Sequence, residues 1–146
     1  MSEMLGNQYF LTRRYFEACS ELESESQKNP KNYSIKKKLI ICYLQTNNLK
    51  KAFHTFFETV KKDIELIKNT DLIHDDCPCP EIIEQNLPDM KSESTAEQYV
   101  KMGILYLYCD INESIKYFEK VPANSEYYAD VKEVLSIEKS QINKIN

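Results

Sequence analysis

The residues best suited to chemistry lie in one stretch, DLIHDDCPCP at positions 71–80, where a histidine precedes two cysteines that flank a proline. Thiolate and imidazole are ligands that zinc prefers, so His74, Cys77 and Cys79, with a neighbouring aspartate as fourth donor, form a candidate metal site. The spacing differs from the usual Cys-x-x-Cys knuckle, and no second cysteine pair follows. Alternatively, the two cysteines bond to each other across the proline, which makes the stretch redox-responsive.

A third interpretation gives this stretch no chemistry of its own. Its prolines interrupt a helix and its aspartates favour turns, so we expect a structured insertion that packs on its neighbours or contacts a partner. The other histidine, His54, lies among phenylalanines in AFHTFF without a nearby nucleophile or paired acid, which is not the arrangement of a general base. We therefore predict no enzyme activity, no cofactor and no bound metal.

The composition limits the classes of function further. The 146 residues carry a net charge of −4, and this mildly acidic balance disfavours a nucleic-acid partner, which needs a basic face. The chain has no apolar run of about 18 residues and no secretory signal pattern, so we expect a cytoplasmic protein without membrane contact. The five cysteines are then expected to be reduced thiols. Only two glycines occur, Gly6 and Gly103, which excludes glycine-rich phosphate loops and favours helices.

Similar residues recur at a spacing of 34 residues in the first part of the chain. The matched pairs are Leu5 and Leu39, Tyr9 and Tyr43, Thr12 and Thr46, Ala18 and Ala52, and Leu22 and Phe56. A small residue followed one turn later by a large one lets the two helices of a pair pack closely. A period of this length is typical of stacked helix pairs.

These segments resemble the tetratricopeptide repeat, in which the first helix carries Leu-Gly-x-x-Tyr and the second carries Ala-x-x-x-Phe before a proline. The first copy has Leu5, Gly6, Tyr9, Tyr15, Ala18, Leu22 and Pro30. The second copy departs from the pattern at Ile40 and has no terminal proline. A third copy has Tyr99, Met102, Gly103, Tyr106, Ser114, Phe118 and Val121. Its turn is one residue shorter, since 11 residues separate Gly103 from Ser114 and 12 separate Gly6 from Ala18.

The resemblance implies an all-α fold, a tetratricopeptide-like helical-repeat array with three helix pairs, a C-terminal capping helix and an insertion between repeats 2 and 3. We expect a single domain over residues 1–146. Its expected parts are repeat 1 at about 2–31, repeat 2 at about 32–68, the insertion at about 69–93, repeat 3 at about 94–122 and the capping helix at about 124–142.

Two helices are predicted around the insertion. The apolar stripe that begins at Ala52 continues at helical spacing to Ile67, which predicts one long helix ending near Asn69. After Pro78, the segment EIIEQN is expected to form one or two helical turns, with Pro80 at the first helical position.

The remaining helix ends are predicted from capping residues. Ser94, followed by Glu97 three residues later, is a capping-box pattern for the third repeat. Asn124 and Ser125 are expected to cap the last helix, whose inner stripe comprises Tyr128, Val131, Val134 or Leu135, and Ile137 or Glu138. The polar carboxy-terminal segment suits a helix that closes an array with one face in water.

The family resemblance also implies a partner-binding groove, lined by the first helix of each repeat. The corresponding residues are Asn7, Phe10 and Leu11 in repeat 1, Lys37, Lys38, Ile41, Leu44 and Gln45 in repeat 2, and Lys101, Ile104, Leu107 and Tyr108 in repeat 3. The apolar members are expected to form a floor, unless the insertion or the last helix covers them. One variant of the family grips a terminal carboxylate, but this chain has Glu3 and Lys38 where that variant has lysine and asparagine, so we do not expect this activity.

These features predict a non-catalytic protein–protein interaction module or scaffold that binds a partner peptide or helix in the groove. Self-association is compatible with this prediction. One alternative is a metal- or redox-responsive regulatory module that acts through His74, Cys77 and Cys79. Another is a secretion-type chaperone, because small, acidic proteins with three such repeats escort apolar segments of secreted partners, although the long insertion is not part of that pattern.

Overall fold

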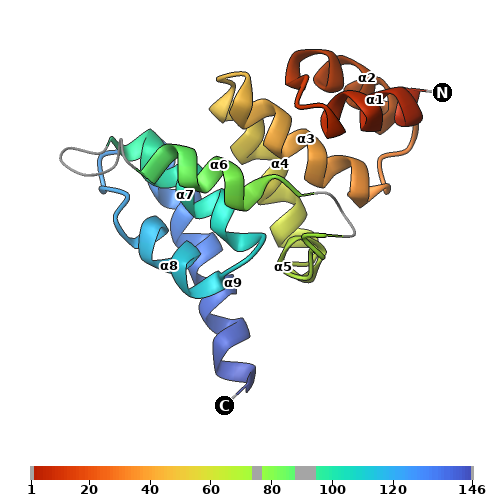
Figure 1. Cartoon of the computed structure of the whole chain (residues 1–146). Helices are drawn as coiled ribbons and strands as arrows, with labels where there is room; N and C mark the ends of the chain where they lie inside the picture. Colours follow the sequence, from red (N-terminus) through yellow and green to blue (C-terminus); the bar gives the residue numbers. More distant parts are fainter. Residues whose placement is uncertain (1, 74–76, 88–94, 146) are drawn as a thin grey trace. The chain divides into compact units, whose positions relative to one another are not determined.

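The computed structural model describes residues 2–73, 77–87 and 95–145, and in these ranges the chain is helical without any β-strand (Figure 1). The all-α prediction is therefore confirmed. The described helices are α1 (Ser2–Leu11), α2 (Tyr15–Lys28), α3 (Tyr33–Gln45), α4 (Leu49–Lys62), α5 (Glu65–Lys68), α6 (Cys79–Asn86), α7 (Ala96–Leu107), α8 (Ile111–Glu119) and α9 (Tyr128–Ile145). None of these described helices combines the length and apolar character that crossing a bilayer requires.

The chain divides into two compact units, Met1–Thr59 (unit 1) and Val60–Asn146 (unit 2). In unit 1, α1 packs against α2, and α2 packs against α3. A Cβ atom on Gly6 would lie 2.7 Å from Leu22 Cδ2, closer than two carbon atoms can approach. Ala18 and Leu22, one turn apart on α2, are fully buried. The glycine and the alanine thus allow the two helix backbones to approach closely, as the sequence pattern predicts.

The turns that follow α1 and α3 share one backbone conformation at the 34-residue spacing. Arg13 and Asn47 both adopt the left-handed conformation, with φ angles of 63° and 60°. The matching bonds are Thr12 Oγ1 to the carbonyls of Gln8 and Tyr9, Thr46 Oγ1 to those of Cys42 and Tyr43, Arg14 N to Tyr9 O, and Asn48 N to Tyr43 O. The last two bonds are both 2.8 Å long. The similarity seen in the sequence is therefore also a similarity of local structure in these two turns.

In unit 2, α7 and α8 pack through the second glycine. A Cβ atom on Gly103 would lie 2.6 Å from two atoms of the Phe118 ring. Beside this contact the rings of Tyr106 and Tyr117 stack, with their centroids 5.4 Å apart. α8 also packs against α9, and α6 packs against α7 (Figure 1). The predicted insertion thus contributes one helix to this unit.

The long helix predicted to end near Asn69 is interrupted at Asp63, between α4 and α5. Asp63 Oδ1 accepts a hydrogen bond from Glu65 N at 3.0 Å, so its side chain competes with the backbone and turns the chain. Ile64 and Ile67 are nevertheless buried. The apolar stripe therefore persists through the turn, which is why periodicity alone does not reveal the interruption.

The cap of α7 differs from the predicted one by a single residue. Gln98 N donates to Thr95 Oγ1 at 3.2 Å, and Thr95 N donates to Gln98 Oε1 at 2.8 Å, which completes a capping box. The predicted cap, Ser94, lies outside the described residues, and Glu97 occupies the first turn. In a capping box, threonine with glutamine accepts hydrogen bonds from the same two backbone N–H groups as serine with glutamate. The predicted type of cap is therefore correct, but it lies one residue later in the chain than predicted.

The sequence also predicted where the insertion helix and the last helix begin, and the structure agrees more closely for the first of these. α6 begins at Cys79, which confirms the predicted helix, but Pro80 is its second residue and not, as predicted, its first. α9 begins at Tyr128 and not at position 124. Ser125 N donates to Pro122 O, and Tyr128 N donates to Ser125 O at 3.1 Å, so the residues before α9 form a turn.

Candidate functional site

Cys77 and Cys79 are joined by a disulfide bond. Pro78 between them turns the backbone, with φ −86° and ψ 11°, and places the two Cα atoms 5.5 Å apart. The bond consumes both thiols of the predicted metal site, and His74 lies outside the described residues. Across the described ranges, no cluster of three or more His, Cys, Asp or Glu side chains is suited to hold a metal ion. The expectation of reduced thiols is wrong for this pair, because the proline turn brings the cysteines within bonding distance.

The disulfide lies at the N-terminal end of α6. Cys79 is fully buried together with Ile82 and Ile83, which follow it at helical spacing. Cys77 is half-buried, and its N–H donates to Leu72 O at 3.0 Å. The disulfide therefore fastens the preceding loop to the first turn of the insertion helix.

In unit 1 the predicted groove floor is buried. Phe10, Ile41 and Leu44 expose 3% of their surface or less. The polar groove residues, Asn7, Lys37, Lys38 and Gln45, are half-buried. Leu11 alone of the apolar groove residues in this unit is exposed, at 50%. The described residues of this unit therefore form no open apolar floor, and the accessible part of the predicted surface lies on α1 and along the polar residues of α3.

One face of α1 carries this accessible surface. Met4, Asn7 and Leu11 share it at spacings of three and four residues, and we name these three residues the α1 strip. Met4 is 64% exposed. Lys38 Nζ donates to Asn7 Oδ1 at 2.9 Å and lies 5.8 Å from the centre of the Phe10 ring, so α3 supplies a cation beside the strip.

In unit 2 the predicted groove residues lie on α7. Ile104, Leu107 and Tyr108 are buried, whereas Lys101 is half-buried, and burial lowers the pKa of its ammonium group. Gly103 meets α8, and at helical spacing Ile104 and Tyr108 point to another side of the helix. The structure places α6 against α7, so the insertion contributes to covering α7.

A buried polar cluster ties the three helices α7, α8 and α9 of unit 2 together. Ser114 Oγ lies 2.7 Å from Gly103 O and 2.6 Å from Glu138 Oε2, and the Glu138 side chain is fully buried. Glu138 Oε1 has no hydrogen-bond partner among the described residues. A buried, partly unsatisfied carboxylate is costly, so the protonation state of Glu138 matters for stability.

Glu138 is best explained as a neutral carboxylic acid. The Ser114 hydroxyl has one hydrogen, and two acceptor oxygens lie at short distance from it. Both contacts are favourable when Ser114 donates to Gly103 O and a protonated Glu138 donates to Ser114 Oγ. In agreement, burial raises the pKa of Glu138 to about 8.

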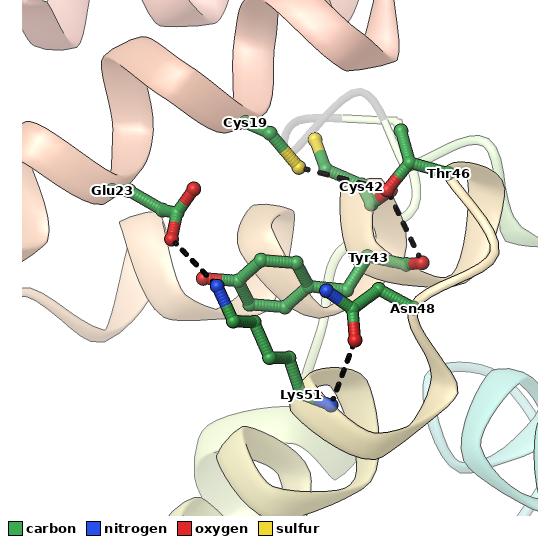
Figure 2. A network of polar contacts seen from close by, with 7 residues as sticks. All are labelled: Cys19, Glu23, Cys42, Tyr43, Thr46, Asn48 and Lys51. Carbon is green, nitrogen blue, oxygen red and sulfur yellow. Dashed lines mark hydrogen bonds and ion pairs between the residues drawn. The ribbon is translucent and has the colours of Figure 1, made fainter.

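A second polar network joins α2, α3 and the start of α4 in unit 1 (Figure 2). Lys51 Nζ lies 3.6 Å from Glu23 Oε2 and 5.8 Å from the centre of the Tyr43 ring. Burial, followed by the hydrogen bond to Glu23, raises the pKa of Tyr43. Inside the same network the thiols of Cys19 and Cys42 contact each other. This pair was not singled out from the sequence, because 23 residues separate its members.

The sequence did carry a signal for Glu138. It follows Val131 and Val134 at spacings of three and four residues, and both valines are buried. A carboxyl group at an inner position of a helical stripe is rarely buried without a partner. The serine that stands at Ser114, where Ala18 stands in the first copy, could have suggested that partner.

Comparison with known proteins identifies no family. The chain matches no protein-family model, no curated protein and no solved structure. A functional assignment therefore depends on the contacts described above.

Proposed function

We propose that this protein is a non-catalytic interaction module that binds a partner polypeptide along α1. The observation that carries the proposal is the α1 strip, in which Met4 and Leu11 expose 64% and 50% of their surface. Large apolar side chains at positions i and i+7 on one exposed helix face suit contact with another chain.

The proposal includes a tetratricopeptide-like arrangement of the helix pairs. It is supported by the two turns that have matching hydrogen bonds 34 residues apart. Further support comes from Gly6 and Gly103, each of which faces a large side chain on the following helix. In such an array the first helix of each pair faces the partner, and α1 is a first helix.

The chemistry beside the strip favours a particular kind of partner. Lys38 places its ammonium group next to Asn7, and Lys37 is half-buried on the same helix, α3. An apolar helix or extended segment with a carboxylate at its edge fits a strip with an apolar centre and a cationic border. Glu3 is held by Asn32 Nδ2 at 3.3 Å, which places a carboxylate at the opposite end of the strip from Leu11.

The test is to charge the strip. Met4→Glu together with Leu11→Glu should abolish co-purification of a partner from native lysate, because two desolvated carboxylates oppose an apolar contact. The matched control is Phe16→Glu, which charges an apolar side chain that is 76% exposed on α2. All three proteins should have the same midpoint of thermal unfolding. If the partner remains bound to the doubly charged variant, the strip is not the binding surface.

The Cys77–Cys79 disulfide favours a second candidate, a redox-responsive regulatory segment. Reduction would release the loop at Leu72 from the first turn of α6. Dithiothreitol should therefore accelerate proteolysis of the segment around α6 in the wild-type protein, and it should leave the rate unchanged in a variant with Cys77→Ser and Cys79→Ser. A wild-type rate that does not respond to the reductant excludes this candidate.

A further inference from the structure

Two thiols from different helices meet in unit 1. Cys19 lies on α2 and Cys42 on α3, and they expose 8% and 0% of their surface. The Cys42 thiol donates a hydrogen bond to the Cys19 sulfur. Figure 2 shows the two side chains directed toward each other between the helices. A disulfide between them requires the two sulfur atoms to approach to about 2 Å.

The surroundings give the two sulfurs different roles. The hydrogen bond from Cys42 is the main cause that lowers the pKa of Cys19, while the same bond raises the pKa of Cys42. Thr46 Oγ1 lies 4.0 Å from Cys19 Sγ, but at 2.9 Å it donates chiefly to the Cys42 carbonyl. Lys51 favours the Cys19 thiolate, and Glu23 and burial oppose it. Cys19 is therefore the nucleophile of the pair and Cys42 the second thiol.

The pair is not a requirement of the helix packing. At the 34-residue spacing, the residue equivalent to Cys19 is Phe53, and the residue equivalent to Cys42 is Gln8. Neither equivalent is a thiol, although the turns around them have the same backbone bonds. Two cysteines in contact at these positions are therefore a particular feature of the junction between α2 and α3.

We propose that Cys19 and Cys42 are an oxidation site, which hydrogen peroxide converts into a disulfide that links α2 to α3. The Cys19 thiolate attacks one peroxide oxygen and the O–O bond breaks. The departing hydroxide takes a proton and becomes water, which leaves a sulfenic acid on Cys19. Cys42 then loses its proton and displaces hydroxide from the Cys19 sulfur, so the S–S bond forms and a second water is released. Two thiols lose two electrons in total, and one hydrogen peroxide accepts them.

The other cysteines are expected to be less reactive than Cys19. Cys77 and Cys79 are already bonded to each other, and Cys109 is an exposed free thiol outside the pair. Desolvation, followed by the charge of Asp110, raises the pKa of Cys109, which lowers its thiolate fraction, so we expect the pair to be oxidised first.

The experiment is a disulfide map after treatment of the wild-type protein with a few equivalents of hydrogen peroxide. The remaining thiols are alkylated in denaturant, and the protein is digested and analysed by mass spectrometry. The expected product joins the peptides of Cys19 and Cys42, is lighter by two hydrogen atoms than the separate peptides, and is released by dithiothreitol. Recovery of both cysteines as alkylated thiols, or of Cys19 joined to a different cysteine, overturns the proposal.

A variant tests the order of the two steps. In Cys42→Ser the second thiol is missing, so the Cys19 sulfenic acid should accumulate and be trapped by dimedone in denaturant. Cys109→Ser is the matched control and should give the same Cys19–Cys42 product as the wild type. Dimedone adducts on Cys42 in a Cys19→Ser variant at the same rate would contradict the assigned nucleophile. If a variant does not fold, the wild-type map still decides the proposal.

Discussion

The first and third helix pairs, α1 with α2 and α7 with α8, use the same packing device with different chemistry. In each pair a glycine faces a large side chain, Gly6 against Leu22 and Gly103 against Phe118. The small residue at the next contact is Ala18 in the first pair and Ser114 in the third. The alanine side chain makes no hydrogen bonds. The buried hydroxyl of Ser114, in contrast, is hydrogen-bonded to both the Gly103 carbonyl and the carboxyl group of Glu138.

The difference between Ala18 and Ser114 determines whether the stability of a helix pair depends on pH. The first pair is held by apolar contacts, which are insensitive to pH. The third pair is linked to α9 through the hydrogen bond between Ser114 and the protonated Glu138. One hydroxyl group at a buried position therefore makes the contact with α9 dependent on protonation.

The largest expected effect is a pH dependence that belongs to unit 2. The pKa of Glu138 is about 8 in the folded protein against a usual value of 4.5. Between these values the folded state keeps a proton that the unfolded state loses, so the free energy of unfolding falls as pH rises. The slope is about 1.4 kcal/mol per pH unit, and the total loss from pH 5 to 8 is on the order of 4 kcal/mol. Urea unfolding measured across this range by circular dichroism checks it.

Two variants separate Glu138 from the other carboxyl groups. Glu138→Gln cannot ionise, so this component of the pH dependence should disappear and stability should become nearly constant between pH 5 and 8. Glu133→Gln removes an exposed carboxyl group on the same helix and should follow the wild type. If Glu138→Gln retains the wild-type slope, Glu138 is not the titrating group.

The next largest expected effect is the loss of stability when either packing glycine is replaced by alanine. Gly103→Ala should lower the free energy of unfolding by about 2 kcal/mol, because the new methyl group meets a rigid, buried ring and α7 is packed by both α6 and α8. Gly6→Ala should cost about 1 kcal/mol or less, since the Leu22 side chain can change rotamer and the opposite face of α1 is exposed. Alanine also gains about 1 kcal/mol of helix propensity at both sites. Equal losses in chemical denaturation would mean that the two contacts are equally rigid.

Much of the helical framework can be predicted from the sequence. The 34-residue period pairs Thr12 with Thr46, and these two threonines make the same kind of hydrogen bond in the turns after α1 and α3. Periodicity could not show the turn at Asp63, because Ile64 and Ile67 continue the apolar stripe through it. The hydrogen bond from Glu65 N to the Asp63 carboxylate decides this turn, and a bond of this kind leaves no periodic pattern in the sequence.

The candidate sites were harder to predict than the helices. Family resemblance assigned Ile104 and Tyr108 to a groove floor that the insertion or the last helix could cover, and both are buried in a unit where the insertion adds α6 to α7. The effect of an insertion on its neighbours is a matter of tertiary packing, which a repeat pattern does not contain. The Cys19–Cys42 contact likewise depends on how α2 meets α3, and no local spacing reveals it.

The smallest expected effect concerns the turn of each pair. Arg13 holds a left-handed backbone with φ 63°, which costs a residue with a Cβ atom about 1 kcal/mol. Arg13→Gly removes this cost, but glycine also gains freedom in the unfolded chain, so the net gain in stability should be about 0.5 kcal/mol. Asn47→Gly should change stability by less, since asparagine tolerates this conformation better than arginine.

The turn between α7 and α8 supplies the contrast, because none of its described residues has a positive φ angle. Cys109→Gly therefore relieves no backbone strain and should lower the free energy of unfolding by about 0.5 kcal/mol, through the freedom it adds to the unfolded chain. The three variants, compared by denaturant midpoints at one pH, should rank Arg13→Gly above Asn47→Gly and Asn47→Gly above Cys109→Gly. If Cys109→Gly stabilises the protein, the turn between α7 and α8 is also strained. The first and third helix pairs would then not differ in their turns.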